Sequence, residues 1–125
     1  MTKEELSLLI EETFSSRDEL GNPGGGISTL VSVGPDKLSY IRGKSRMYLP
    51  YETIFNVLEK YPRGILTTNN LRQFEPSIFD QKHGGHNCNC TFLLSVLTKL
   101  QFTEGGIQGM GQSGCPFFVK MRASV

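Results

Sequence analysis

The clearest structural signal in the chain is the segment PYETIFNVLEKY, residues 50–61. Its large apolar side chains recur at helical spacing, at Tyr51, Ile54, Phe55, Leu58 and Tyr61. Pro50 stands where the first turn of a helix tolerates proline, and Pro62-Arg63-Gly64 is a stop signal. The segment therefore predicts an amphipathic helix with one buried face.

Two predicted elements precede this helix. Segment 3–16 has apolar residues at helical spacing, and Thr2 with Glu5 matches a capping box, so we expect an amphipathic helix there. Segments 27–33 and 38–42 are rich in strand-forming residues and are separated by turn residues, so they predict a β-hairpin.

Further elements are predicted after the 50–61 helix. Thr67 or Thr68 can cap a short helix that Pro76 ends, and apolar spacing predicts a third helix over residues 88–101. The tail 103–121 predicts two short strands around a glycine-rich loop. The helical stripes and the tail place nine side chains in one core: Ile54, Phe55, Leu58, Leu71, Phe74, Leu93, Val96, Leu97 and Phe117.

Over residues 48–122 the order helix, short helix, helix, strand–loop–strand resembles the winged helix-turn-helix superfamily. The resemblance implies that residues 88–101 form a recognition helix for the major groove and that residues 103–121 form the wing. One departure is the stretch from Phe74 to Cys88, because a tight helix-turn-helix has a turn of about 3–4 residues.

We therefore expect an α+β fold in a single domain, residues 1–125. An amino-terminal helix and β-hairpin would occupy residues 1–47. A winged-helix-like three-helix unit with a carboxy-terminal β-hairpin would occupy residues 48–125.

Composition and charge narrow the function classes. The chain has 125 residues, 38% of them hydrophobic, which suits one domain with a packed core. Three cysteines, an amino terminus without an apolar leader and no long apolar run favour a cytoplasmic protein without a membrane partner. Residues 1–20 carry two basic and six acidic side chains (−4), and residues 21–125 carry eleven basic and six acidic ones (+5).

A basic body with an acidic first helix is compatible with a polyanion partner, so we expect double-stranded DNA. Cationic side chains would meet phosphates, and short polar side chains before the 88–101 helix and in the wing would reach bases or backbone. The candidate DNA-binding residues are Arg42, Lys44, Arg46, Arg72, Lys82, His86, Asn87, Asn89, Thr91, Lys99, Gln108 and Gln112. The acidic helix is expected to lie away from this face.

The sequence thus predicts a small DNA-binding protein, either a regulator or the recognition module of a DNA-processing system. A winged-helix scaffold also serves protein–protein recognition, because a fold does not fix a function. The alternative is therefore an interaction module or inhibitor that docks through its acidic first helix.

A cluster of His83, His86, Cys88 and Cys90, with Cys115 further on, contains residue types that bind zinc. A Cys-x-Cys pair seldom lets both sulfurs reach one tetrahedral ion. We therefore expect no metal, no cofactor, and cysteines that serve as small buried residues.

The same stretch offers an enzymatic alternative. The element Asn87-Cys88-Asn89-Cys90-Thr91-Phe92 resembles the N-C-N-x-F motif of the PPPDE family of deubiquitinase-like cysteine peptidases. The resemblance implies that Cys88 is a nucleophile. That family has its catalytic histidine on an early strand, whereas this chain has no histidine before His83. We therefore expect a protein that is not an enzyme, with a cysteine hydrolase as the further alternative.

Overall fold

The computed structural model describes residues 1–122. Helix α1, Lys3–Thr13, begins at the predicted capping box: Thr2 Oγ1 accepts from Glu5 N (3.1 Å), and Thr2 N donates to a Glu5 carboxylate oxygen (3.0 Å). It ends at Thr13, three residues earlier than expected, and Phe14 is its C-cap. Its inner face is buried, so the predicted amphipathic character is confirmed.

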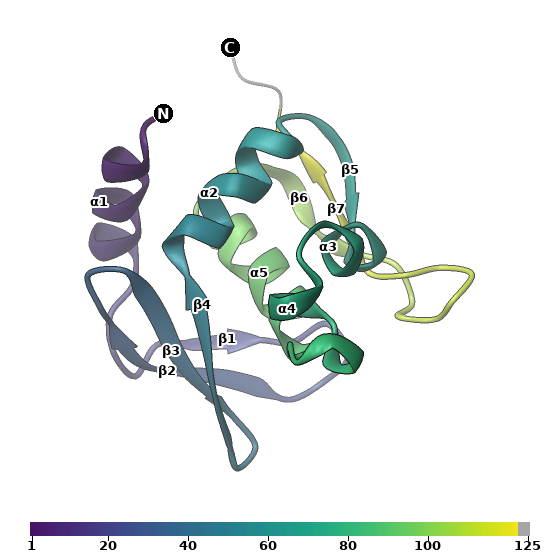
Figure 1. Cartoon of the computed structure of the whole chain (residues 1–125), viewed down its shortest axis with the longest axis horizontal. Coiled ribbons are helices and arrows are strands. Elements are labelled where there is room, and N and C mark those ends of the chain that lie inside the picture. The colour runs from purple at the N-terminus through teal and green to yellow at the C-terminus, as the bar shows by residue number, and fades with distance from the viewer. Residues whose placement is uncertain (123–125) are drawn as a thin grey trace.

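An antiparallel four-stranded sheet follows, in the order β1-β2-β3-β4 (Figure 1). Its strands are β1 Glu19–Gly21, β2 Ile27–Val33, β3 Lys37–Arg42 and β4 Ser45–Pro50. The predicted hairpin is confirmed as β2 and β3, while β1 and β4 were not predicted. Gly43 turns the chain between β3 and β4 with a φ of 64°, a conformation that glycine adopts without strain.

The rest of the chain forms a three-helix unit with a second antiparallel sheet, in the order β5-β7-β6 (Figure 1). Its elements are α2 Tyr51–Lys60, β5 Gly64–Thr67, α3 Thr68–Phe74, α5 Cys88–Lys99, β6 Thr103–Gln108 and β7 Phe118–Met121. The three predicted helices and the terminal strand–loop–strand are confirmed, and β5 is an addition. The described chain is therefore α+β, as expected.

The long stretch between α3 and α5 is folded and packed. It holds the short helix α4, Pro76–Phe79, and the 3₁₀ turn η1, Gln81–His83. Gly85 lies directly against α4, since a Cβ there would stand 2.6 Å from the Ile78 carbonyl carbon and 2.7 Å from Pro76 O. Close packing of backbone on backbone thus brings the start of α5 back towards α3.

One hydrophobic core joins the two sheets and the helices. Between the four-stranded sheet and α5, the rings of Tyr40 and Phe92 stack with centroids 3.7 Å apart. Five predicted core residues are fully buried: Ile54, Leu71, Leu93, Val96 and Leu97. The other four predicted core residues pack against the core while partly exposed: Phe55, Leu58, Phe74 and Phe117. The core extends beyond the predicted unit, because α1 and the four-stranded sheet contribute to it.

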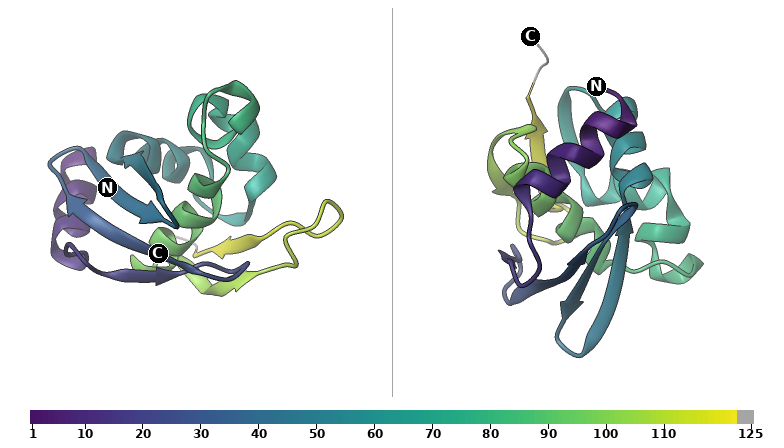
Figure 2. Two further views of the ribbon diagram at one scale, coloured as in Figure 1. Left: turned by 90° about the horizontal axis from the view of Figure 1, so that it is seen from below. Right: turned by 90° about the vertical axis from the view of Figure 1, so that its left-hand side faces the viewer.

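The acidic helix α1 and the loop between β6 and β7 lie at opposite ends of the molecule. Helix α1 lies at one end of the long axis, and the loop between β6 and β7 projects from the other (Figures 1 and 2). The acidic helix is therefore far from that loop. No helix within residues 1–122 is long and apolar enough to cross a membrane.

Candidate nucleic-acid interface

The start of α5 is tied to the four-stranded sheet by a side-chain hydrogen bond. Arg42, half-buried at the end of β3, donates from Nη1 to Thr91 Oγ1 over 3.0 Å. Thr91 Oγ1 in turn donates to the carbonyl of Cys88 over 3.3 Å. Two of the predicted residues, Arg42 and Thr91, are thus in direct contact although they are 49 positions apart.

The turn between β3 and β4 carries further positive charge. Lys44 and Arg46 are both exposed. The Arg46 guanidinium lies 5.8 Å from the centroid of the Tyr48 ring, and Lys37 Nζ lies 4.6 Å from the same centroid. Cations stacked on an aromatic ring remain available to an anion on their outer side.

A polar crevice of about 170 Å³ lies where α3, the start of α5 and the β6–β7 loop meet. Four predicted residues line it: Arg72, Asn87, Thr91 and Gln112. The fold therefore brings together residues that the sequence analysis selected from three separate segments.

Arg72 is the charged group of the crevice. Its guanidinium donates to Asn69 Oδ1 and to Cys90 Sγ, the latter over 3.8 Å. Burial raises the pKa of the Cys90 thiol to about 11, so this partner is neutral at physiological pH. Within residues 1–122 Arg72 forms no ion pair. Its positive charge is therefore not neutralised by a carboxylate.

Glycines let the β6–β7 loop fold tightly on itself at the edge of the crevice. Gly109 has a φ of 97°, and a Cβ there would lie 2.1 Å from Pro116 O. Gly111 has a φ of 75°, and its Cβ would lie 2.5 Å from the Phe117 ring. A side chain at either position would therefore disturb the close packing of the loop on itself.

Asn89 does not belong to this surface, which corrects the sequence analysis. It is only 2% exposed, and its amide is used internally. Tyr40 donates from its hydroxyl to Asn89 Oδ1 over 2.5 Å, and Asn89 Nδ2 donates to the Ile78 carbonyl over 3.1 Å. Burial raises the pKa of Tyr40 well above its usual value, which keeps the donating hydroxyl protonated. Asn89 therefore cannot reach a base edge.

Lys99 also lies away from the crevice. It is eleven residues after Cys88 in α5, a rise of about 16 Å along the helix. It lines a different, open cavity of about 620 Å³ formed with residues 19–23 and Ile107. Its position corrects the expectation that all the cations share one face.

Three other predicted residues are exposed but do not line the crevice. His86 is exposed just before α5, and its backbone N donates to the Ile78 carbonyl over 3.0 Å. Lys82 is exposed in η1, and Gln108 is exposed at the end of β6, where it pairs with Phe118.

Sequence reasoning missed Asn69 and Phe117 as crevice-lining residues. For Asn69, position gives a signal: it lies next to Asn70, which closes a capping box with Thr67 and so fixes the first turn of α3. No pattern in the sequence indicates that Phe117 lines the crevice beside α3.

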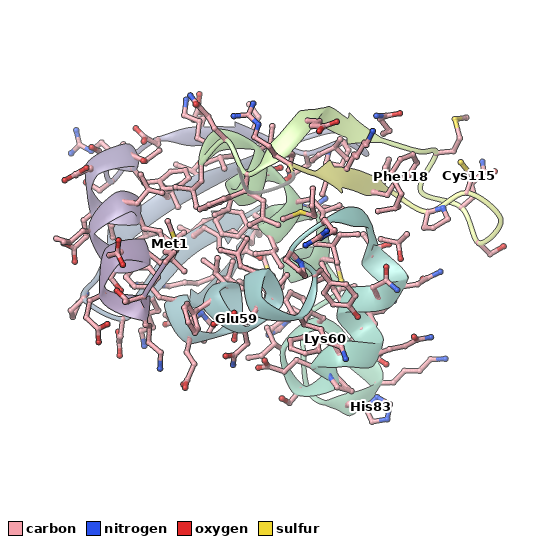
Figure 3. All side chains as sticks on the ribbon, turned by 90° about the horizontal axis from the view of Figure 1, so that it is seen from above. Met1, Glu59, Lys60, His83, Cys115 and Phe118 are labelled. Carbon is pink, nitrogen blue, oxygen red and sulfur yellow. The ribbon has the colours of Figure 1, made fainter. Side chains whose placement is uncertain are left out.

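The cysteines and histidines are dispersed. Cys90 is buried, Cys88 is half-buried and Cys115 is exposed, and all three are free thiols. Figure 3 shows Cys115 and His83 on separate projections of the molecule. Within residues 1–122 no three His, Cys, Asp or Glu side chains are placed to hold a metal ion.

The positions of the two histidines bear on the cysteine-hydrolase alternative. His83 Nδ1 pairs with Asp80 over 3.0 Å, and in the described part of the chain neither histidine hydrogen-bonds to Cys88. The cysteine hydrolase with Cys88 as its nucleophile stays a prediction.

Comparisons with models of known protein families, with curated proteins and with solved structures found no match to this chain.

Proposed function

We propose that this protein binds duplex DNA through the face formed by the β3–β4 turn, the start of α5 and the β6–β7 loop. The observation that carries the proposal is the convergence of Arg72, Asn87, Thr91 and Gln112 on one crevice, with Arg42 bonded to Thr91. Cations for phosphates and amides for base edges thereby share one surface.

The order of elements supports the same function. Helices α2, α3 and α5 followed by β6, loop and β7 have the order of the winged-helix superfamily. In that arrangement α5 would enter the major groove and the glycine-rich loop would follow the backbone as a wing. The proposal treats the chain as a regulator or as the recognition module of a DNA-processing system.

The distribution of charge is consistent with this orientation. The acidic α1 lies at the end of the molecule opposite the β6–β7 loop, so its carboxylates would not repel phosphates at the proposed face (Figure 2). Lys44 and Arg46 extend from the sheet with no carboxylate partner within residues 1–122. Such cations release counterions when they meet phosphates.

One observation favours the alternative, a protein-interaction module. Leu8 on α1 is 59% exposed although it belongs to an otherwise amphipathic helix. A partner that docks on α1 would cover it. Under that alternative, Leu8→Asp would abolish partner binding, and changes to the β3–β4 turn would have no effect.

The test compares cation removals at two ends of the molecule. We expect Lys44→Ala and Arg46→Ala to weaken binding to all duplexes about equally and to reduce the salt slope by about one unit each. The matched control is Arg63→Ala. Arg63 is exposed in the connection between α2 and β5, at the opposite end of the view from the β3–β4 turn (Figure 1).

Fluorescence anisotropy with unrelated duplexes at several salt concentrations provides the measurement. The face is assigned wrongly if Arg63→Ala weakens binding as much as Arg46→Ala does. Absence of duplex binding even at low salt would favour the interaction module.

A further inference from the structure

The chemistry of the crevice is dominated by amides rather than by charge. Asn69, Asn87 and Gln112 each carry an amide with one donor and one acceptor group, while Arg72 is the single cation among the lining residues. Asn87 Oδ1 already accepts from Gln81 N over 3.2 Å, which leaves its NH₂ group for a ligand. The crevice can therefore read a pattern of donors and acceptors.

We propose that the crevice receives one unpaired nucleobase. The inference rests on the proposed DNA binding and deepens it, because it names the DNA that the protein selects: duplexes with a mismatched, bulged or otherwise unpaired base. Bases carry adjacent donors and acceptors on their edges, and asparagine and glutamine amides pair with such edges in two places at once.

The walls of the crevice suit a flat heterocycle. The Phe117 ring lies on one side against Gly111, and the Arg72 guanidinium is held in place by Asn69 and Cys90. Aromatic rings and guanidinium planes are the side-chain surfaces on which bases stack. A phosphate site would instead place several cations together, and the lining residues include only one.

The size of the crevice suits a single base that has left the DNA double helix. The crevice volume of about 170 Å³ is that of roughly six water molecules, which suits one ring system and excludes a stretch of duplex. The lining side chains come from α3, α5 and the loop, so the site is recessed between three elements. A base can enter only after unstacking, which costs least where it is unpaired already.

The experiment measures the affinity of the whole chain for four probes. These are a fully paired duplex, the same duplex with one central mismatch, the duplex with a one-nucleotide bulge, and the single strand. We expect the bulged duplex to bind at least about tenfold more tightly than the paired one, since extruding a paired base costs a few kcal/mol. With 2-aminopurine at the bulge, emission should change on binding as the base leaves its stacked neighbours and enters the crevice.

Asn69→Leu tests the crevice directly, because it removes an exposed amide without a large change in size. We expect the ratio of bulged to paired affinity to fall towards one. The matched control is Asn56→Leu, since Asn56 is exposed on α2 and is not among the lining residues. This variant should keep the ratio of the unmodified protein.

The outcomes separate this inference from the proposed function. Tightest binding to the single strand would support the crevice as a base site and identify single strands as the source of the base. Equal affinity for paired and bulged duplexes would overturn the inference and leave duplex binding standing. No binding to any of the four probes would overturn both.

Discussion

Asn87 and Asn89 show how far two neighbouring residues can differ in role. They lie two positions apart, which at 3.6 residues per turn directs their side chains to opposite sides of the helix. Asn87 lines the crevice, whereas Asn89 joins Tyr40 to the Ile78 carbonyl inside the core. Sequence spacing places both at the helix start, but only the packing of α5 on the sheet decides which one is buried.

Asn89 is predicted to contribute to stability and not to sequence discrimination. Asn89→Ala leaves the buried Tyr40 hydroxyl without its acceptor, so we expect the free energy of unfolding to fall by roughly 1–3 kcal/mol. Urea denaturation measures this loss. Adding Tyr40→Phe removes the orphaned hydroxyl and should recover part of it. If the double variant is less stable by the sum of the two single changes, the hydrogen bond is not the cause.

Cys90 is predicted to make the stability of the folded protein depend on pH. Burial raises its pKa from the ordinary 9.0 to about 11 in the folded protein, while the unfolded thiol ionises near 9.0. The unfolded state therefore loses its proton first, and the stability that the neutral thiol provides is complete below pH 9.0 and declines as the pH rises towards 11. Urea midpoints across this range should fall less steeply for Cys90→Ala. Cys115→Ala is the control, because Cys115 is exposed and should leave the decline unchanged.

At the scale of elements, short segments with local signals could be predicted and those defined by distant pairing could not. The α3 helix was predicted from Thr67 and Pro76. Strand β5 was not predicted, because it is four residues long and is a strand only through its pairing with β7, more than fifty residues later. Strand β4 was not predicted, because Ser45 and Arg46 were interpreted as a charged extension of the hairpin. In the structure Met47 and Leu49 alternate into the core.

The cap of α3 should be important for stability because this helix carries Asn69 and Arg72. Thr67 Oγ1 accepts from Asn70 N over 3.0 Å, and Thr67 N donates to Asn70 Oδ1 over 2.9 Å. Thr67→Ala removes the first bond, so we expect a loss of about 0.5–2 kcal/mol. Thr67→Ser keeps the hydroxyl and should retain most of the stability. Thermal unfolding that does not distinguish Ala from Ser would rule out the capping bond as the source of the effect.

At the scale of the whole molecule, one core holds the sheet and the three-helix unit together. Leu97 is fully buried in it, whereas Leu8 is 59% exposed on α1. We expect Leu97→Ala to lower the free energy of unfolding by roughly 2–5 kcal/mol. Leu8→Ala should change it by about 0.5 kcal/mol or less. Chemical denaturation in which the two variants lose equal stability would contradict the position of Leu97 in the core.

The sequence predicted the α+β class, the three main helices and some of the residues that line the crevice, because helical stripes, caps and glycine-rich turns are local patterns. It did not predict that α5 would bury Asn89, or that Lys99 would face a different cavity. Those positions depend on the rotation of α5 against a sheet whose outer strands the sequence did not reveal.

The most direct test of the proposed duplex binding is a titration of the unmodified protein with a fully paired duplex over a range of salt concentrations. Several phosphate contacts should make the logarithm of the affinity fall linearly with the logarithm of salt, with a slope of about −0.9 per phosphate neutralised. We expect binding at low salt that weakens with a slope of about −2.7, from Arg42, Lys44 and Arg46 together. Absence of binding at low salt, or binding without salt dependence, would contradict it.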